Sequence, residues 1–359
     1  MRYPNIGKYF HVSTNTLLIG VKAGILAMFL GVIQVLLQPT SLIIICGMFG
    51  IFVASIIETI GHNLDRVIRL RYCLFLSVCT GITFGLGVYT SGHYFITVIL
   101  ITIFMIIYGY SNTQYTIMSN IILFTGNLFV IGNGIPAPNW QLSIGYGLGF
   151  LLGSSSMFAL EYIVFFYKIR REPLEYKFNS NNCLFNFSRK TTIFAFLYTT
   201  TVIFAYTISY SLKLEQGFWV PMTTLLIFKS CYDLSWQRVA HRFTGSLLGF
   251  IVALSIGVYI SNLWVLLSLI FILYCLIVVS LAKHYGAYAF FLTIMITTLY
   301  KLINFNGASL TQHRLIDTVI GVSIVAIVLV IRKILIQLIR ELCVAFVSAE
   351  HGKRILNQS

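Results

Sequence analysis

The sequence predicts an all-α polytopic membrane protein with about twelve transmembrane helices, arranged as two parallel six-helix repeats. The first observation behind this prediction is composition: 58% of the 359 residues are hydrophobic and only 9% are charged, against about 25% charged in ordinary soluble domains. This composition excludes a typical soluble enzyme, and it excludes a disordered chain, which needs low hydrophobicity and high charge. The second observation is a series of long apolar runs. The third is a short string that recurs in both halves of the chain.

The apolar runs approach the length that a membrane span requires. About 20 apolar residues cross a hydrocarbon core of about 30 Å, and the first run is too long for the core of a signal peptide. Two runs, 217–230 and 286–300, are short, which favours tilted, broken or partly re-entrant helices. The predicted spans are 16–37, 41–60, 73–90, 94–110, 117–132, 142–167, 191–211, 217–230, 243–260, 262–281, 286–300 and 315–333.

A polar stretch at 168–190 divides the spans into two sets of six. The predicted organisation is therefore a first six-helix unit at 1–167, a cytoplasmic linker at 168–190, a second six-helix unit at 191–333, and a cytoplasmic or interfacial tail at 334–359.

The recurring string supports a repeat. Gly87-Val88-Tyr89 in the first set returns as Gly257-Val258-Tyr259 in the second set. An even number of spans in each half makes the two halves parallel, related by an axis along the membrane normal.

The net charge of +14 would suggest nucleic acid as the partner of a soluble protein. In a polytopic protein, however, Lys and Arg are enriched in cytoplasmic segments. Placing both termini in the cytoplasm puts most Lys and Arg residues there and leaves Lys213, Lys301 and Arg314 on the outer side. The sequence therefore predicts the lipid bilayer as a partner, and no nucleic acid.

Several chemistries lack a sequence signature. The seven cysteines include no CxxC pair, and no P-loop, HExxH or GxSxG motif occurs. We therefore expect no catalytic residues, no metal, no cofactor and no ATPase activity of the chain's own, and we do not expect an enzyme.

Charged residues at membrane depth are costly and often functional. Lys22 lies within the first span, where its stem can snorkel towards the interface. Glu58 and Lys229 end equivalent spans of the two halves. They are either a pair flanking a substrate pathway or two unrelated interfacial charges.

The second half holds a more informative cluster. Trp219 and Pro221 open a short helix, and the proline is either a harmless kink or a break that frees backbone groups for binding. Arg238 and Arg242 follow, four residues apart and so on one helical face. They either reflect membrane topology or attract anions at the cytoplasmic mouth of a pathway, since guanidinium groups bind carboxylates bidentately.

Arg314 and Asp317 lie three apart at the start of the last span. On a helix they can pair and lock it in place. Alternatively, Asp317 titrates in a partly dry cavity and couples transport to protons.

These motifs resemble a known family. Trp219-Val220-Pro221-Met222-Thr223, then Arg238 and Arg242 with Gly245 and Gly249, then Arg314-Leu315-Ile316-Asp317 with Gly321, are similar to the membrane domain of the fusaric acid resistance protein family (FUSC), to which bacterial aromatic acid exporters belong. The resemblance covers roughly 189–333.

The resemblance implies an inner-membrane transporter, expected to be an exporter, of small organic and often aromatic anions. From the residues themselves we expect the substrate pathway to involve Trp219, Pro221, Lys229, Arg238, Arg242 and Glu58. We expect Arg314 and Asp317 to couple transport or to lock the last helix. A channel-like anion pore and a non-transporting membrane scaffold are the alternatives. Homo-oligomerisation is left open.

Overall fold

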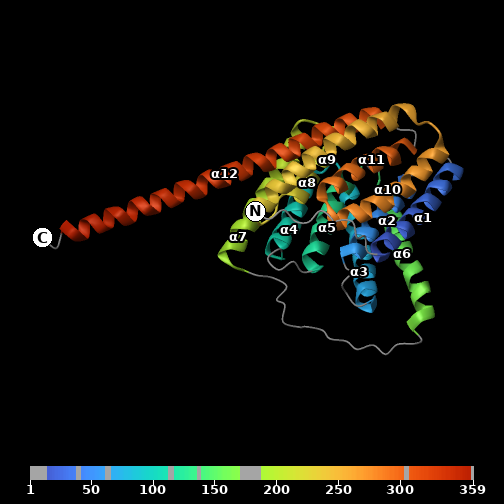
Figure 1. The fold of residues 1–359 in the computed structure, drawn as a ribbon, viewed down its shortest axis with the longest axis horizontal. Coiled ribbons are helices and arrows are strands. Elements are labelled where there is room, and N and C mark those ends of the chain that lie inside the picture. Colours follow the sequence, from blue (N-terminus) through green and yellow to red (C-terminus); the bar gives the residue numbers. More distant parts are fainter. Residues whose placement is uncertain are drawn as a thin grey trace.

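The computed structural model describes residues 14–37, 42–60, 66–111, 117–135, 139–169, 187–302 and 307–356. These residues form twelve helices and no strand, which confirms an all-helical fold (Figure 1). The helices are α1 Thr14–Leu37, α2 Leu42–Ile60, α3 Arg66–Tyr89, α4 Tyr94–Ser111, α5 Ile117–Asn133, α6 Trp140–Ile169, α7 Arg189–Ser211, α8 Trp219–Ile227, α9 Tyr232–Tyr259, α10 Leu263–Lys283, α11 Tyr285–Leu302 and α12 Gly307–Leu356.

Eight of these helices are long and apolar enough to cross a membrane. The prediction of twelve spans is therefore only partly confirmed. The two runs that looked short are not among these eight: α8 has 9 residues, and α11 has 18 but is mostly buried. A nine-residue helix extends only about 14 Å, less than half of a hydrocarbon core.

The helices pack in a pattern that links distant parts of the chain. Within the first six, α2 packs on α6 and α3 packs on both α5 and α6. Within the last six, α8 packs on α12 and α9 packs on both α11 and α12. Two further contacts join these groups, α1 with α10 and α4 with α7.

Glycines allow the closest of these approaches. A Cβ at Gly153 of α6 would collide with the backbone of Gly47 in α2, and one at Gly87 of α3 would collide with the carbonyl of Phe129 in α5. In the other group, a Cβ at Gly245 of α9 would collide with the carbonyl of Gly286. Small residues at helix contacts are the usual packing device of membrane helices.

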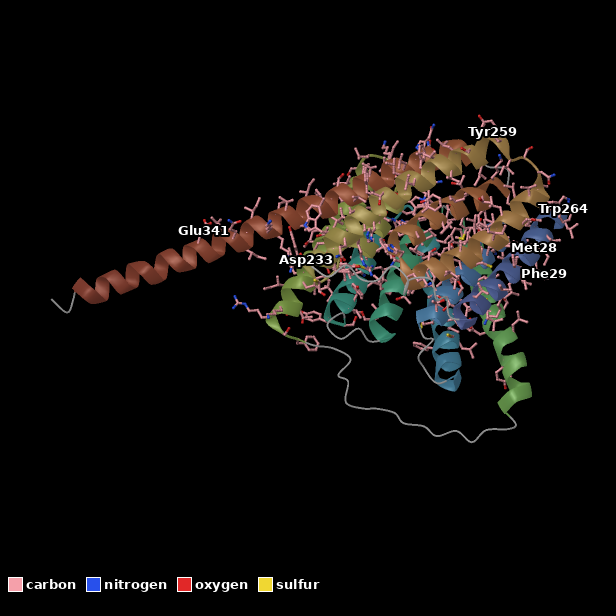
Figure 2. All side chains as sticks on the ribbon, in the orientation of Figure 1. Met28, Phe29, Asp233, Tyr259, Trp264 and Glu341 are labelled. Carbon is pink, nitrogen blue, oxygen red and sulfur yellow. The ribbon has the colours of Figure 1, made fainter. Side chains whose placement is uncertain are left out.

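Large apolar side chains cover the outside of the bundle. Phe29 is 60% exposed, Trp264 69% and Tyr259 83%, and Figure 2 shows the three at the periphery. Such surfaces would be a liability in water, but they suit a lipid environment, in which Trp and Tyr favour the interfaces. The apolar helices and this outward apolar surface indicate a multi-pass membrane protein.

The last helix differs from its predicted division into a span and a tail. α12 runs without interruption from Gly307 to Leu356, and its C-terminal part leaves the bundle as a free rod (Figure 1). The tail predicted at 334–359 is thus, as far as the structure describes it, a continuation of the last span. Ile334, Leu335 and Ile336, near the start of the predicted tail, are exposed.

Candidate anion site

The short helix α8 ends inside the protein, and side chains cap it there. The chain becomes extended at Phe228 and turns helical again at Tyr232. The last carbonyl groups of a helix need partners from outside the helix. Tyr198 of α7 donates its hydroxyl to the carbonyl of Leu225 (3.0 Å), and Arg238 of α9 donates to the carbonyl of Leu226 (3.0 Å).

Pro221 is not the cause of this break. It is the third residue of α8, within the first turn, where backbone N–H groups have no intrahelical acceptor. The idea that Pro221 disrupts the helix and frees backbone groups is therefore wrong. The discontinuity lies at the other end of the helix, where Phe228 leaves the helical conformation.

Arg238 is therefore engaged with the protein rather than free at a mouth. Besides its bond to α8, its guanidinium group lies 5.0 Å from the centre of the Tyr285 ring of α11. It remains partly exposed. Its arrangement joins α8, α9 and α11 around one cation.

Arg242, one turn further along α9, has a different environment. It is fully buried, and none of its three guanidinium nitrogens has a hydrogen-bond partner among the described residues. Burying an ionised group without a partner costs several kcal/mol, so such groups are rare unless they bind something. Arg242 is thus preorganised to receive an acceptor that the protein itself does not supply.

Arg314 of α12 is also buried. One terminal nitrogen donates to the carbonyls of Leu292 (3.2 Å) and Thr293 (3.1 Å) in α11, and the other has no partner. The guanidinium lies 4.3 Å from the centre of the Trp219 ring of α8, a distance typical of a cation–π contact. Trp219 itself is buried and donates to Gln216 (3.1 Å).

The expected pair of Arg314 and Asp317 does not form. Within the described residues Asp317 makes no ion pair, and its Oδ2 is buried without a hydrogen-bond partner. A spacing of three permits a pair on a helix, but Arg314 reaches α11 instead. Asp317 therefore does not lock the helix through Arg314.

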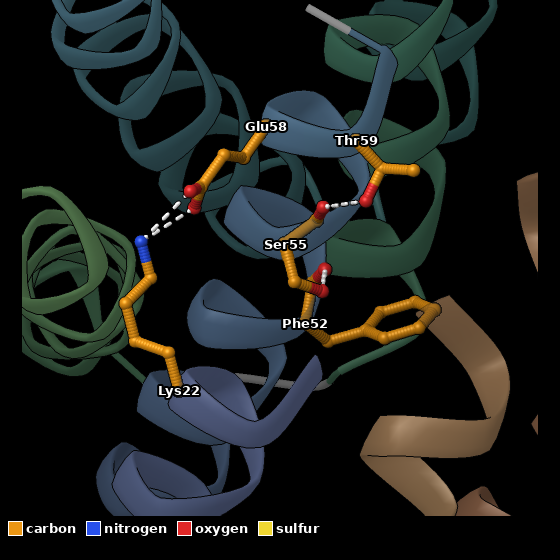
Figure 3. A network of polar contacts seen from close by, with 5 residues as sticks. All are labelled: Lys22, Phe52, Ser55, Glu58 and Thr59. Atoms are coloured by element: carbon orange, nitrogen blue, oxygen red, sulfur yellow. Dashed lines mark hydrogen bonds and ion pairs between the residues drawn. The ribbon is translucent and has the colours of Figure 1, made fainter. Parts of the chain in front are cut away.

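Lys229 and Glu58 do not pair with each other either. Buried Lys229 donates to the hydroxyl of Tyr108 in α4 (3.2 Å). Glu58 accepts from Lys22 at 2.9 and 2.7 Å, which joins α1 to α2 (Figure 3). Lys22 is held inside the bundle rather than snorkelling to the interface. This ion pair neutralises Glu58, so the carboxylate does not balance the cations of the second half.

The four cations Lys229, Arg238, Arg242 and Arg314 form one group, which we call the cationic cluster. Tyr288 of α11 lies within electrostatic range of all three arginines, and Lys229 lies within range of Arg238. No carboxylate forms an ion pair with any of the four in the described part of the chain. A dry site with excess positive charge favours an anion strongly, because electrostatic attraction increases as the dielectric constant falls.

Several residues of this region have no obvious sequence signature. Tyr285 and Tyr288 lie three apart on α11, next to the arginines, and the Tyr285 hydroxyl is buried without a partner in the described structure. Tyr108 comes from the first half. The roles of these tyrosines depend on which helices pack together, so no motif in the sequence indicated them. Among the described residues, no group of three or more His, Cys, Asp or Glu side chains is arranged to hold a metal ion.

The chain is similar to two curated bacterial proteins. One, an uncharacterized protein of Haemophilus influenzae, is 24% identical over 147 residues, which cover 41% of this chain and 20% of that protein. The other, the uncharacterized protein ORF2 of Neisseria gonorrhoeae, is 28% identical over 120 residues, which cover 33% of this chain and 29% of that protein. The chain thus spans less than a third of the length of either relative.

No solved structure matches the chain significantly. A family model does: residues 194–328 match the family described as fusaric acid resistance protein-like. This match runs from α7 into α12 and contains every member of the cationic cluster. The resemblance inferred from the motifs is confirmed over this region, since residues 194–328 are similar to the fusaric acid resistance protein-like family.

Proposed function

We propose that this protein transports small organic anions across the inner membrane, in the export direction and without an ATPase of its own. The observation that carries the proposal is Arg242: a fully buried guanidinium whose three nitrogens have no hydrogen-bond partner among the described residues. A carboxylate is the natural partner for such a group, since it can accept two parallel hydrogen bonds. Transient occupation by substrate would offset the cost of burying the charge.

The arrangement of the cluster supports a stepwise pathway. Lys229 and Arg238 lie at the break between α8 and α9, while Arg242 and Arg314 lie further along α9 and α12. An anion would be attracted first by Lys229 and Arg238, and would then be held between Arg242 and Arg314. Trp219, Tyr285 and Tyr288 add aromatic surfaces beside the guanidinium groups, which favours an aromatic acid as substrate.

The export direction follows the family description, which names resistance to fusaric acid. We place both termini in the cytoplasm because this position leaves most Lys and Arg residues on the cytoplasmic side.

The architecture that fits this function is a pair of parallel six-helix repeats. Its support is the matching set of helix contacts: α2 with α6 corresponds to α8 with α12, α3 with α5 corresponds to α9 with α11, and α1 with α10 corresponds to α7 with α4. A pathway between the repeats would be lined by cations on one side only, since the cluster belongs to the second repeat.

The test is solute flux in proteoliposomes that contain the purified full chain. The panel consists of hydroxylated benzoates, dicarboxylates and, as cationic controls, polyamines, with a pH gradient and a voltage imposed separately. We expect saturable flux of the benzoates and none of the polyamines. Polyamine flux, or no flux of either anion class, would contradict the proposal.

The same assay separates coupled export from a channel. If a proton gradient drives flux and Asp317→Asn removes that dependence, Asp317 is the coupling group. Non-saturating flux that follows voltage alone would instead identify an anion channel.

A further inference from the structure

A groove lies between α7 and α12, and Ser230, which follows Lys229 of the cationic cluster, also lines it. Its volume is about 1360 Å³, larger than the roughly 300–1,000 Å³ of typical small-molecule sites. Its wall is mostly apolar, with Phe196, Leu197 and Phe204 from α7 and Ile331 from α12. Such a groove accommodates long hydrocarbon chains better than a compact solute.

The groove also carries positive charge. Lys190, near the start of α7, and Arg332 of α12 both line it, and no Asp or Glu is among the described residues that do so. Lys190 lies at one end of the α7 wall, and the apolar residues of α7 extend away from it. This polarity matches an amphiphile with an anionic headgroup.

We propose that this groove is a resident site for an anionic phospholipid, with its acyl chains along α7 and its phosphate near Lys190 and Arg332. Basic pockets between membrane helices are suited to anionic headgroups, particularly where the leaflet itself is anionic. The groove is lined by residues of both α7 and α12, so the lipid would fill the space between these two helices. Lipid binding here does not depend on the proposed transport function.

A second copy of the chain fits the groove less well. Two copies related by an axis along the membrane normal would bring Lys190 and Arg332 of each together with those of the other. Like charges in contact oppose such an interface. An anionic lipid removes this repulsion.

The test is lipid retention measured by native mass spectrometry. The full-length protein is released from nanodiscs that contain equal parts of phosphatidylglycerol and phosphatidylethanolamine. We expect one retained phosphatidylglycerol in preference to phosphatidylethanolamine. In the double variant K190Q/R332Q we expect roughly tenfold weaker retention or more, the effect of losing two cations near an anionic headgroup.

The matched control is R189Q/K333Q. It changes the adjacent residues on the same two helices, removes the same charge and leaves the residues that line the groove intact, so its retention should equal that of the parent. A second variant, T200W, keeps both cations but fills the groove from an exposed position, and it should also lose the lipid.

Equal retention of both lipids would overturn the headgroup assignment. Retention that K190Q/R332Q and R189Q/K333Q reduce alike would show nonspecific charge attraction. Retention that T200W leaves unchanged would show that the acyl chains lie elsewhere, and a dimer without lipid would assign the groove to a second copy.

Discussion

In the first half of the molecule, the buried Glu58 is neutralised by Lys22 at 2.7 Å within α1 and α2. In the second half, Arg242 and Arg314 are buried without any ion-pair partner among the described residues. Both halves nevertheless use glycines in the same way, with Gly153 against Gly47 in one and Gly245 against Gly286 in the other. The two halves therefore pack their helices similarly, but the buried charge forms an ion pair in the first half and none among the described residues in the second.

This difference indicates that the glycine contacts hold the helices together, whereas the buried cations of the second half serve another role. A bundle of apolar helices closed by glycine contacts needs no buried cation, and replacing buried ions by apolar residues is often neutral or stabilising. Arg242 thus costs stability without making a hydrogen bond to any described residue. A protein that keeps such groups is expected to use them, as is common where function opposes stability.

The largest expected effect follows from breaking the Lys22–Glu58 ion pair of the first half. Lys22→Met would remove the ammonium group that contacts the buried Glu58 carboxylate, so we expect the free energy of unfolding to fall by about 3–5 kcal/mol. Denaturation in mixed micelles measures it. The double variant K22M/E58Q removes both charges and should recover part of the loss. If K22M alone has no effect, the pair does not stabilise the first half.

The next effect concerns the packing that both halves share. Gly153→Ala would place a Cβ against the backbone of Gly47, and overpacking of this kind costs about 1–3 kcal/mol. Gly145→Ala on the same helix is the matched control, because its Cβ would lie 3.5 Å from the nearest atom, a side-chain carbon of Ile43. We expect the melting temperature to fall in the first variant only. Equal melting temperatures would show that α2 and α6 are not held at glycine contact.

A smaller effect is expected at Lys301, a cation of the second half that lies outside the cationic cluster and has a structural role. Lys301 donates to the carbonyl of Ile256 (3.1 Å) at the end of α9, where a positive charge stabilises the helix terminus. Lys301→Met should lower stability by about 0.3–1 kcal/mol and leave flux unchanged. Lys213→Met, in the turn after α7, serves as control. Loss of flux in K301M would extend the pathway beyond the cluster.

Much of the fold could be predicted from the sequence, because apolar runs of span length leave few alternatives to membrane helices. The short runs at 217–230 and 286–300 were recognisable as exceptions for the same reason. The continuity of α12 could not be predicted. Charged residues such as Arg340 and Glu341 can mark either a change of environment along a helix or the end of the helix.

The charged residues of the candidate site could be named from the sequence, but the contacts that they make could not. The residue types of the cationic cluster stand out in an apolar sequence, so Arg238, Arg242 and Arg314 could be named. Their partners could not, because the contacts of Glu58 with Lys22 and of Arg314 with Trp219 depend on which helices meet. The repeat instead offered Glu58 with Lys229 as one alternative, and the spacing of three favoured Arg314 with Asp317. The structure forms neither pair.

The most direct test of the central claim is to measure the flux and the melting temperature of Arg242→Met together. Losing a buried charged contact to substrate costs about 2–5 kcal/mol, which corresponds to at least about a tenfold loss of flux. We predict this loss with a melting temperature that is unchanged or higher, while Arg189→Met, at an exposed arginine, alters neither quantity. Unchanged flux in Arg242→Met, or a melting temperature that falls along with it, would contradict the claim that Arg242 is kept for substrate rather than for the fold.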